Sequence, residues 1–567
     1  MFETMPRRYE AVKDWDWSDF APYAQDLMER PLDAGSLPGW LGDYSRLLET
    51  AWECYSRLQV ARTQNTRDEE AQRRFREFVQ NVMPALQIAN QQLNTRLVAS
   101  GLEPENFSVP LRKMQADVAL FREENVPLIV EAVQLGTEYD KISGAQTVVW
   151  EGEERTLVEM NKVLEDSDRT QREQAWRAIM ERTLEDRAAL NTLWVRLLKI
   201  RRRIAANAGK ADFREYAWED RHRFDYSPKD AATFRRAILE VVVPAAERLY
   251  QRQAAQLGVD RLRPWDLDVD AQGRLPLRPF RDGADLEEKS AAILKQVDPT
   301  LGGYFETMRA QRYLDLDNRK GKAPGGYCTS FPIEGLPFIF MNAVGLHRDV
   351  RTLLHEAGHA FHNFEARSLK YAQQRLYPIE FGEVASMAME LLATPYLTED
   401  FGGYFSLPDA ARYRAAHLAK IIHFFPYMAV VDGFQDWAYT HADAAEDPAK
   451  CDAKWSELWD QYMRGVDWSG FEDAKVTGWH RKLHIFRIPF YYIEYGLAQL
   501  GALQIWRNAL EDPGKALQQY RSALALGGTR SIPGLYQAAG AAFIFDAEQI
   551  APLIALAERT VSELEAQ

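Results

Sequence analysis

Two histidines and a glutamate lie close together in the middle of the chain with the spacing of a metal site. The stretch reads Leu354-His355-Glu356-Ala357-Gly358-His359-Ala360-Phe361-His362. On a helix, His355 and His359 lie one turn apart on the same face, with Glu356 beside them. Zinc takes nitrogen ligands at about 2.0–2.1 Å, and a carboxylate beside such a pair can reach a metal-activated water without being a ligand itself. The pattern therefore predicts hydrolysis of an amide bond.

The residues around this motif decide between a metal site and an ordinary polar helix face. His-Glu-x-x-His fixes only three positions, so it also arises where a helix merely faces solvent. Its neighbours here are apolar or small, which is typical of a buried helix: Val350, Leu353, Leu354, Ala357, Ala360 and Phe361. Buried imidazoles and carboxylates are costly unless they are paired or bound to a metal. The flanking residues therefore favour the metal site.

A catalytic zinc needs a third protein ligand and an open fourth position for water. Residues 381–390 read as a second helix with apolar surroundings, on which Glu383 and Glu390 lie two turns apart on one face. We expect Glu383 to be the third ligand and Glu390 to accept a hydrogen bond from an imidazole N–H, which would fix the tautomer of a ligand. His362 is the rival third ligand, and we interpret it instead as a hydrogen-bonded core histidine.

Taken together, these motifs resemble the thimet oligopeptidase and oligoendopeptidase F family of zinc metallopeptidases. Within that family the closest resemblance is to the bacterial oligoendopeptidases of the Pz-peptidase type. The resemblance extends over residues 150–560 and includes four stretches: residues 355–362, residues 382–386 with Glu390, Arg319 to Cys328, and Pro489 to Gly496. It implies a mainly α fold of the zincin type, in which two helical lobes enclose a deep channel with a small β-sheet at the active site. It also implies one Zn²⁺ per chain and short unfolded peptides as substrates.

A cluster of aromatic residues follows the metal motif at residues 479–496. Tyr492 and Tyr495 are three residues apart, so a helix would present both phenols on one face, and phenols can donate hydrogen bonds to an oxyanion. A packed aromatic core is the alternative interpretation. By resemblance to the family, we assign catalytic roles to Tyr492, Tyr495 and His484. The assignment leaves two choices open, between His480 and His484 and between Tyr491 and Tyr492.

The interval before the metal motif has a different composition from the rest of the chain. Glycines and a proline form a loop, and residues 327–331 and 338–342 read as two short strands. We expect the second strand to be an exposed sheet edge, which an extended peptide would join through main-chain hydrogen bonds. A plain core strand is the alternative. The predicted substrate contacts are Gly325, Gly326, Phe340 and Asn342.

The length and composition of the chain point to more than one lobe. At 567 residues, with 46% hydrophobic residues, it exceeds what one simple core usually holds. Helical periodicity dominates, and a short β-rich piece near residues 146–150 marks a boundary. We therefore predict an N-terminal helical lobe at 1–150 and a catalytic metallopeptidase region at 151–567, with its His-Glu-x-x-His helix at 350–366.

The net charge and the cysteine content indicate which binding partners and which cellular compartment are expected for the protein. With 69 Lys and Arg against 83 Asp and Glu, the net charge is −14, which disfavours nucleic acid and anionic membranes as partners. The start of the chain lacks the apolar core of a signal peptide, and no run of about 18 apolar residues occurs. Three scattered cysteines do not make a disulfide scaffold. We expect a cytoplasmic protein whose partners are oligopeptides, with the oligomeric state open.

The sequence thus predicts a zinc-dependent oligoendopeptidase that hydrolyses internal bonds of short unfolded peptides with a metal-activated water. Glu356 would be the general base, and Tyr492 or Tyr495 would stabilise the oxyanion. One alternative is a zinc carboxypeptidase or dipeptidyl carboxypeptidase, which would need a cationic group for the peptide C-terminus. The other is a non-catalytic peptide-binding protein. Cobalt or manganese could replace zinc, because the affinity order alone does not select the metal.

Overall fold

A computed structural model describes all residues, 1–567, and the chain divides into two compact units. The first unit combines three separate stretches, Met1–Ala119, Leu277–Tyr413 and Leu497–Phe543. The second unit is made of Leu120–Pro276, Arg414–Gly496 and Ile544–Gln567. This division differs from the predicted regions 1–150 and 151–567. Residues 1–119 belong to the same unit as the metal-motif helix, a long-range relation that local composition does not reveal.

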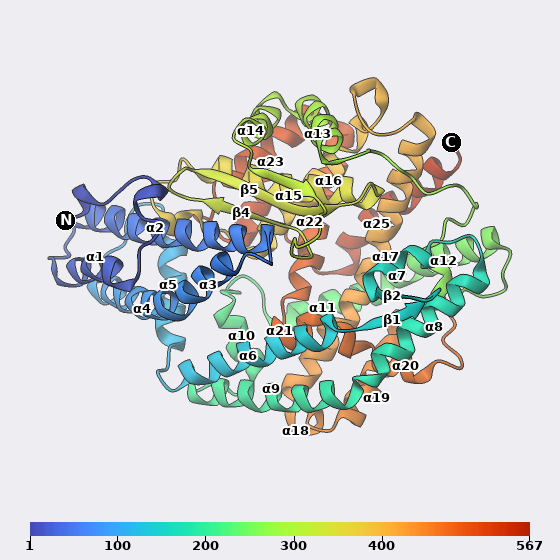
Figure 1. The fold of residues 1–567 in the computed structure, drawn as a ribbon, viewed down its shortest axis with the longest axis horizontal. Helices are drawn as coiled ribbons and strands as arrows, with labels where there is room; N and C mark the ends of the chain where they lie inside the picture. Colours follow the sequence, from blue (N-terminus) through green and yellow to red (C-terminus); the bar gives the residue numbers. More distant parts are fainter. The chain divides into compact units, whose positions relative to one another are not determined.

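Helices make up most of both units (Figure 1). Those of the first unit are α1 (Trp17–Glu29), α2 (Leu37–Gln64), α3 (Glu69–Glu77), α4 (Met83–Ser100), α5 (Ser108–Leu120), α13 (Gly283–Val297), α14 (Pro299–Ala310), α15 (His347–Ala366), α16 (Ile379–Leu392), α23 (Pro513–Leu524) and α24 (Ile532–Ala538). The helices α17 (Leu407–Thr440) and α22 (Tyr492–Glu511) contribute residues to both units. The predicted mainly α fold is confirmed.

A three-stranded sheet in the first unit lies next to the metal-motif helix. Its strands are β3 (Leu314–Asp317), β4 (Tyr327–Phe331) and β5 (Leu336–Ala343), in the order β3-β5-β4. β3 runs parallel to β5, and β4 pairs antiparallel with it, with Cys328 opposite Ile339. Figure 1 shows β4 and β5 beside α15, and α15 contacts both strands. The predicted small sheet near the metal motif is therefore present.

The helix α2 packs against one face of this sheet. Val60 of α2 belongs to one hydrophobic cluster with Phe331, Phe338 and Phe340. Because side chains alternate along a strand, Tyr327 and Thr329 of β4 lie on one face, and both contact α2. An N-terminal helix thus buries the sheet face that would otherwise be exposed next to the predicted site.

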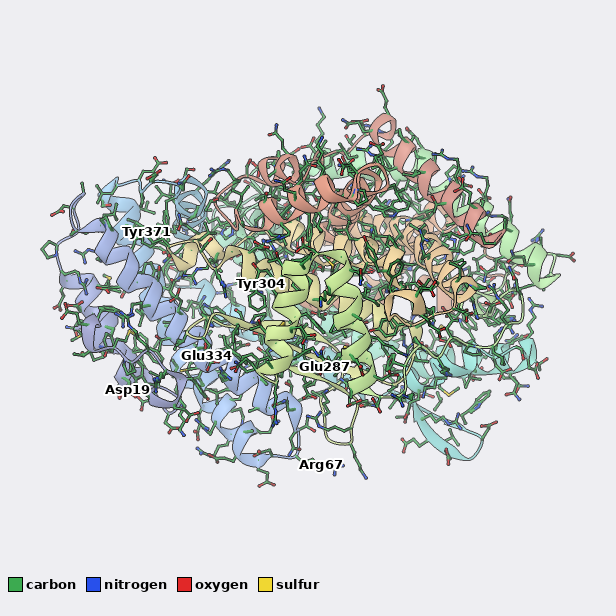
Figure 2. All side chains as sticks on the ribbon, turned by 90° about the horizontal axis from the view of Figure 1, so that it is seen from above. Asp19, Arg67, Glu287, Tyr304, Glu334 and Tyr371 are labelled. Atoms are coloured by element: carbon green, nitrogen blue, oxygen red, sulfur yellow. The ribbon has the colours of Figure 1, made fainter.

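α15 is held on another side by α14. Tyr304 of α14, labelled in Figure 2, stacks on Phe364 of α15 with ring centroids 4.5 Å apart and an interplanar angle of 5°. The helix begins after a tight connection from β5, where the buried Asp349 carboxylate accepts the backbone N–H groups of Val344 and Leu346 at 2.8 and 2.9 Å. These contacts fix the start and the body of the metal-motif helix.

The second unit is a helical assembly with one hairpin. Its helices are α6 (Asn125–Gly144), α7 (Leu157–Leu164), α8 (Arg169–Glu185), α9 (Arg187–Asn207), α10 (Phe213–Asp220), α11 (Pro228–Ala237), α12 (Val243–Leu257), α18 (Ala442–Ala445), α19 (Pro448–Tyr462), α20 (Glu472–Val476), α21 (Leu483–Arg487) and α25 (Ala547–Glu565). β1 (Thr147–Trp150) and β2 (Glu153–Thr156) pair antiparallel. The carboxylate of Asp168 accepts the N–H of Thr170 at 2.8 Å and so caps α8, because first-turn N–H groups have no partner within the helix.

No helix of the structure combines the length and the apolar composition that crossing a bilayer requires.

Candidate functional site

α15 and α16 cross at very close range, and Gly358 permits it. A Cβ atom at Gly358 would lie 2.5 Å from the carbonyl oxygen of Ala385 and 2.6 Å from Cα of Ser386. The Tyr520 hydroxyl donates to the same Ala385 carbonyl at 2.8 Å, which fixes α16 at the crossing. Because His359 follows Gly358 and Glu383 lies one turn from Ser386, the crossing brings the two predicted ligand helices together.

Replacing Gly358 by alanine is expected to separate these helices. The added methyl group meets backbone atoms, which cannot rotate away, so we expect a loss of about 1–3 kcal/mol of stability and weaker metal binding. Gly303 in α14 has open space around the position of a Cβ atom, so Gly303→Ala is the matched control: it should leave metal binding unchanged and raise stability by about 0.5–1 kcal/mol. Urea unfolding and metal content would be measured for both variants. Equal stability of Gly358→Ala and wild type would contradict the close crossing.

Three donor groups converge where the helices cross. The Nε2 atoms of His355 and His359 lie 3.4 and 3.7 Å from the same Oε2 atom of Glu383. All three donor atoms lie within 4.8 Å of one another, which makes them a group that could hold one metal ion. The structure thus brings together the three residues predicted as ligands. Two imidazoles and one carboxylate are a donor set that zinc accepts.

Further contacts orient each of these donors. The Nδ1 atom of His355 lies 2.7 Å from Oε1 of Glu390. Since a carboxylate is the acceptor, Nδ1 carries the proton and Nε2 keeps a free lone pair for a metal. Ser386 donates its hydroxyl to Oε2 of Glu383 at 3.1 Å, and Arg351 lies 3.9 Å from Glu390. Glu390 therefore occupies the place predicted for it.

Glu356 lies on the same helix with its carboxylate almost buried, at 8% exposure. Burial raises the pKa of Glu356 to about 7, and the nearby Glu383 and Glu390 carboxylates also raise it. The backbone of Cys328 on β4 lies close to the Glu356 carboxylate and lowers its pKa. A carboxylate with a pKa near neutrality can both accept and release a proton, which suits a general base.

The charges of the site favour a bound cation. Burial lowers the pKa of His359 to about 4, so this imidazole is neutral, which is the form that binds a metal. Burial would raise the pKa of Glu383, but its hydrogen bond with His355 and the nearby imidazoles lower it to about 2. Burial would likewise lower the pKa of His355, yet hydrogen bonds to Glu383 and Glu390 raise it. The carboxyl groups of Glu383 and Glu390 thus favour a positive charge at His355, and a divalent ion can supply it.

His362 is neither a member of the three-donor group nor a hydrogen-bonded core histidine. It is fully buried, and its ring stacks on Tyr377 with centroids 3.6 Å apart. Neither ring nitrogen has a hydrogen-bond partner, and His362 is outside the three-donor group. The expectation of a hydrogen-bonded core histidine was therefore wrong in its bonding, because ring stacking holds this side chain. Burial lowers its pKa, so it is neutral.

The predicted exposed edge at residues 338–342 was wrong. These residues belong to β5, which is the central strand, with β3 on one side and β4 on the other. The alternative interpretation, a core strand, is the one that the structure supports. The outer strand on this side is β4, and the backbone of its residue Cys328 influences the Glu356 carboxylate. The strand edge next to the candidate base is therefore β4.

The predicted substrate contacts Phe340 and Asn342 lie on this central strand. Phe340 is 1% exposed, and its ring stacks on Tyr327 with centroids 4.9 Å apart. Asn342 uses its amide N–H groups to hold the carbonyls of Ala323 and Gly325, both at 2.8 Å. Both side chains are therefore structural. Gly325 and Gly326 are exposed in the loop, and Gly325 has a φ of +98° that favours glycine.

The predicted histidine and tyrosines lie together in the second unit. The His484 ring lies 4.9 Å from that of Tyr492 and 5.9 Å from that of Tyr495. His480 is buried and bonded through Nε2 to Asn191 at 2.8 Å. His480 is thus part of the core, which leaves His484 as the candidate. Tyr492 is buried, and its hydroxyl accepts a hydrogen bond from Lys482 at 2.9 Å.

Several residues that complete these clusters were not predicted from the sequence. They are Ser386 and Arg351 around the metal ligands, Cys328 at the base, and Lys482 at Tyr492. Ser386 lies in the motif Gly382-Glu383-Val384-Ala385-Ser386, three residues from the ligand, so helical spacing could have identified it. Cys328 acts through its backbone, and Lys482 precedes Tyr492 by ten positions. Neither residue could therefore be predicted from helical spacing.

A mostly helical scaffold that presents two histidines and a glutamate in this way is typical of metallopeptidases of the zincin type. Comparison with known families supports this class. Residues 162–277 and 301–551, more than half of the chain, match Peptidase family M3. The chain belongs to this family and is a metallopeptidase.

Individual relatives agree with the family. An oligoendopeptidase F homologue of Mycoplasma pneumoniae is 33% identical over 142 residues, which are 24% of this chain and 22% of that protein. One from Borreliella burgdorferi is 23% identical over 301 residues, 51% of this chain and 48% of its own length. The matches thus span less than half of these relatives. A solved structure of Pz peptidase A with an inhibitor has a TM-score of 0.88 at 27% identity, with 99% of both chains covered.

Proposed function

We propose that this protein is a zinc-dependent oligoendopeptidase that cleaves internal bonds of short unfolded peptides. The observation that carries the proposal is the convergence of His355, His359 and Glu383 with the buried Glu356 alongside. The similarity to oligoendopeptidase F homologues and to Pz peptidase A supports the substrate class.

Zinc bound by His355, His359 and Glu383 would lower the pKa of a water toward about 7 and polarise the scissile carbonyl. The other steps belong to residues of the chain. Glu356 takes the proton of the attacking water and delivers it to the leaving amine. The products are two shorter peptides.

The backbone of β4 is suited to hold the substrate. An extended peptide that added to the outer edge of β4 would be bound by main-chain hydrogen bonds, which depend little on side-chain identity. Cys328 is the second residue of that strand, and its backbone lies close enough to Glu356 to lower the pKa of this carboxyl group. A substrate in this position would therefore lie along the strand nearest to the base.

In the second unit, we assign the oxyanion donor to the phenols near His484. Lys482 Nζ lies 2.9 Å from the Tyr492 hydroxyl and 4.0 Å from the centre of its ring. A charged ammonium has three donors and no acceptor, so the Tyr492 oxygen must accept from it. The phenolic proton of Tyr492 is then free to donate to another group, as an oxyanion requires.

Lys482→Met is expected to reduce kcat/KM by about 10- to 100-fold with little change in KM, because the phenolic proton is no longer directed outward.

Burial lowers the pKa of Lys482 to about 8. Above that pH the neutral amine can accept the phenolic proton, so wild-type kcat should fall as pH rises through about 8. The pH–rate profile of Lys482→Met should lack this fall. Lys475→Met, which removes an ion pair with Asp460 in the same unit, is the control. A fall unchanged in Lys482→Met would contradict the assignment.

An end-blocked peptide of about ten residues tests the proposed reaction, since peptides of this size are unfolded. Mass spectrometry of its products should reveal internal cleavage that a chelator abolishes. If the blocked peptide stays intact while a peptide with free ends is trimmed from one end, the protein is a carboxypeptidase or dipeptidyl carboxypeptidase. If neither peptide is cut, the zinc is structural and the protein binds peptides without cleaving them.

A further inference from the structure

A pocket on the surface of the second unit, widely open to solvent, is lined by four arginines that the proposed reaction does not use. Its volume is about 540 Å³, within the range of small-molecule sites. The lining residues are Arg169, Glu173, Arg177, Gly258, Val259, Asp260, Arg261, Arg263 and Trp265. Four arginines and two acidic residues, Glu173 and Asp260, line it. In a chain with a net charge of −14, such a concentration of arginines is a local exception.

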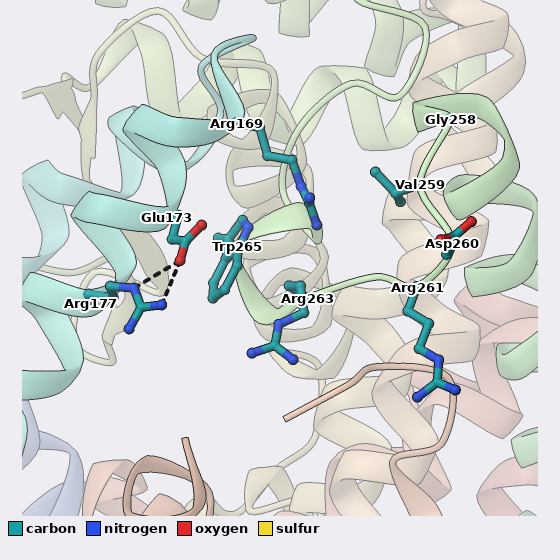
Figure 3. A pocket seen from close by; sticks show the side chains of 9 residues that line it. All are labelled: Arg169, Glu173, Arg177, Gly258, Val259, Asp260, Arg261, Arg263 and Trp265. Atoms are coloured by element: carbon teal, nitrogen blue, oxygen red, sulfur yellow. Dashed lines mark hydrogen bonds and ion pairs between the residues drawn. The ribbon is translucent and has the colours of Figure 1, made fainter. Parts of the chain in front are cut away.

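Three of these arginines are held in place by carboxylates. Arg169 binds Asp266 through Nε and Nη2, at 3.0 and 2.8 Å. Arg177 binds Glu173 through the same two nitrogens, at 2.9 and 2.6 Å, an interaction drawn in Figure 3. Each leaves its Nη1 atom without a protein partner. Arg263 lies 3.0 Å from Asp467. The like charges are therefore fixed by these contacts, and part of their hydrogen-bonding capacity remains unused.

Arg261 and Trp265 have donors that the protein leaves entirely unsatisfied. Arg261 is exposed and makes no hydrogen bond or ion pair. Trp265 is 4% exposed, and its buried Nε1–H has no acceptor. A buried N–H without a partner is unfavourable, and a bound acceptor would satisfy it. In Figure 3 the indole of Trp265 lies between Arg177 on one side and the other three arginines on the other.

We infer that this pocket binds a ligand with a diphosphate group. Arginine forks pair with phosphate oxygens through two parallel hydrogen bonds, and phosphate oxygens accept without donating, as the surplus of donors requires. Guanidinium groups on both sides of Trp265 match two linked anionic groups better than one. The volume also exceeds that of a single phosphate. The diphosphate could be free or carried by a nucleoside.

Isothermal titration of the full-length protein with inorganic pyrophosphate tests this inference, at constant ionic strength because surface charges are screened by salt. We expect one saturable site per chain. Arg261→Glu should weaken binding by about 10-fold or more, since it removes a charge-assisted contact and adds a like charge. Trp265→Phe should also weaken it, because the ring is kept and only the N–H is lost.

Arg203→Glu is the matched control. Arg203 lies on α9 in the same unit, is exposed, has no protein partner, and its replacement changes the net charge by the same amount. If it weakens binding as much as Arg261→Glu, the effect is that of net charge and the site is refuted. Absence of saturable pyrophosphate binding refutes it as well. Titration with adenosine diphosphate distinguishes the two sources, because tighter binding than pyrophosphate indicates a nucleotide and weaker binding a free diphosphate.

Discussion

Glu356→Gln is expected to lower kcat/KM for a peptide substrate by about 10²–10⁴-fold while zinc content stays at the wild-type level. The amide keeps the size of the side chain but cannot take a proton from water. Because Glu356 is not one of the three converging donors, its replacement should not release the metal. A peptide hydrolysis assay and a metal analysis of the same purified sample would give kcat/KM and the zinc content.

Glu365→Gln is the control for that variant. Glu365 lies on the same helix and pairs with Arg521 at 2.8 Å, away from the three donors. Its loss of charge should leave kcat/KM near that of wild type. If Glu356→Gln retained full activity, another group would have to be the base, and the proton transfer proposed for Glu356 would be wrong.

Glu383→Ala is expected to lose zinc almost completely, and with it all peptidase activity. Removing the carboxylate takes away one of three ligands and leaves His355 and His359 without the negative charge that favours a cation between them. Glu390→Gln provides a graded comparison, because it disturbs only the hydrogen bond to Nδ1 of His355. Loss of such an outer contact costs about 10–100-fold in metal affinity, and Glu383→Ala should cost more.

Competition with a chromophoric chelator would measure the zinc affinities of Glu383→Ala and Glu390→Gln. Equal zinc affinity in Glu383→Ala and wild type would exclude Glu383 as a ligand, and the ion would then be bound elsewhere.

The metal ligands could be predicted from the sequence because they depend on helical spacing. His355 and His359 are four residues apart, and the apolar flanks of residues 381–390 placed Glu383 on an inward face. Helix boundaries with side-chain caps were also predictable, as Asp168 illustrates. In each case the information lies within a few residues of the chain.

The sheet edge could not be predicted in the same way. β3 reads Leu314-Asp315-Leu316-Asp317, and its two aspartates give it little β-propensity, so the strand was missed and β5 was taken for an edge. Asp315 is nevertheless accommodated, because Lys322 Nζ binds its carboxylate at 2.8 Å. A buried ion pair between residues seven positions apart overrode the local preference.

The division into units was hidden for a related reason. Residues 1–119 belong with residues 277–413, and only the packed structure reveals contacts at that separation. Gly358 is a local example: in the sequence it looks like a weak point in a helix, whereas in the structure it is where α16 approaches.

The most direct test of the metal centre is a zinc titration of the metal-free wild-type protein, with cleavage of an end-blocked peptide as the readout. We expect no activity without metal, and a linear recovery that ends at one zinc per chain, because the three donors form one site. Full activity in the metal-free protein, or a recovery that requires two or more ions per chain, would contradict a single catalytic zinc at His355, His359 and Glu383.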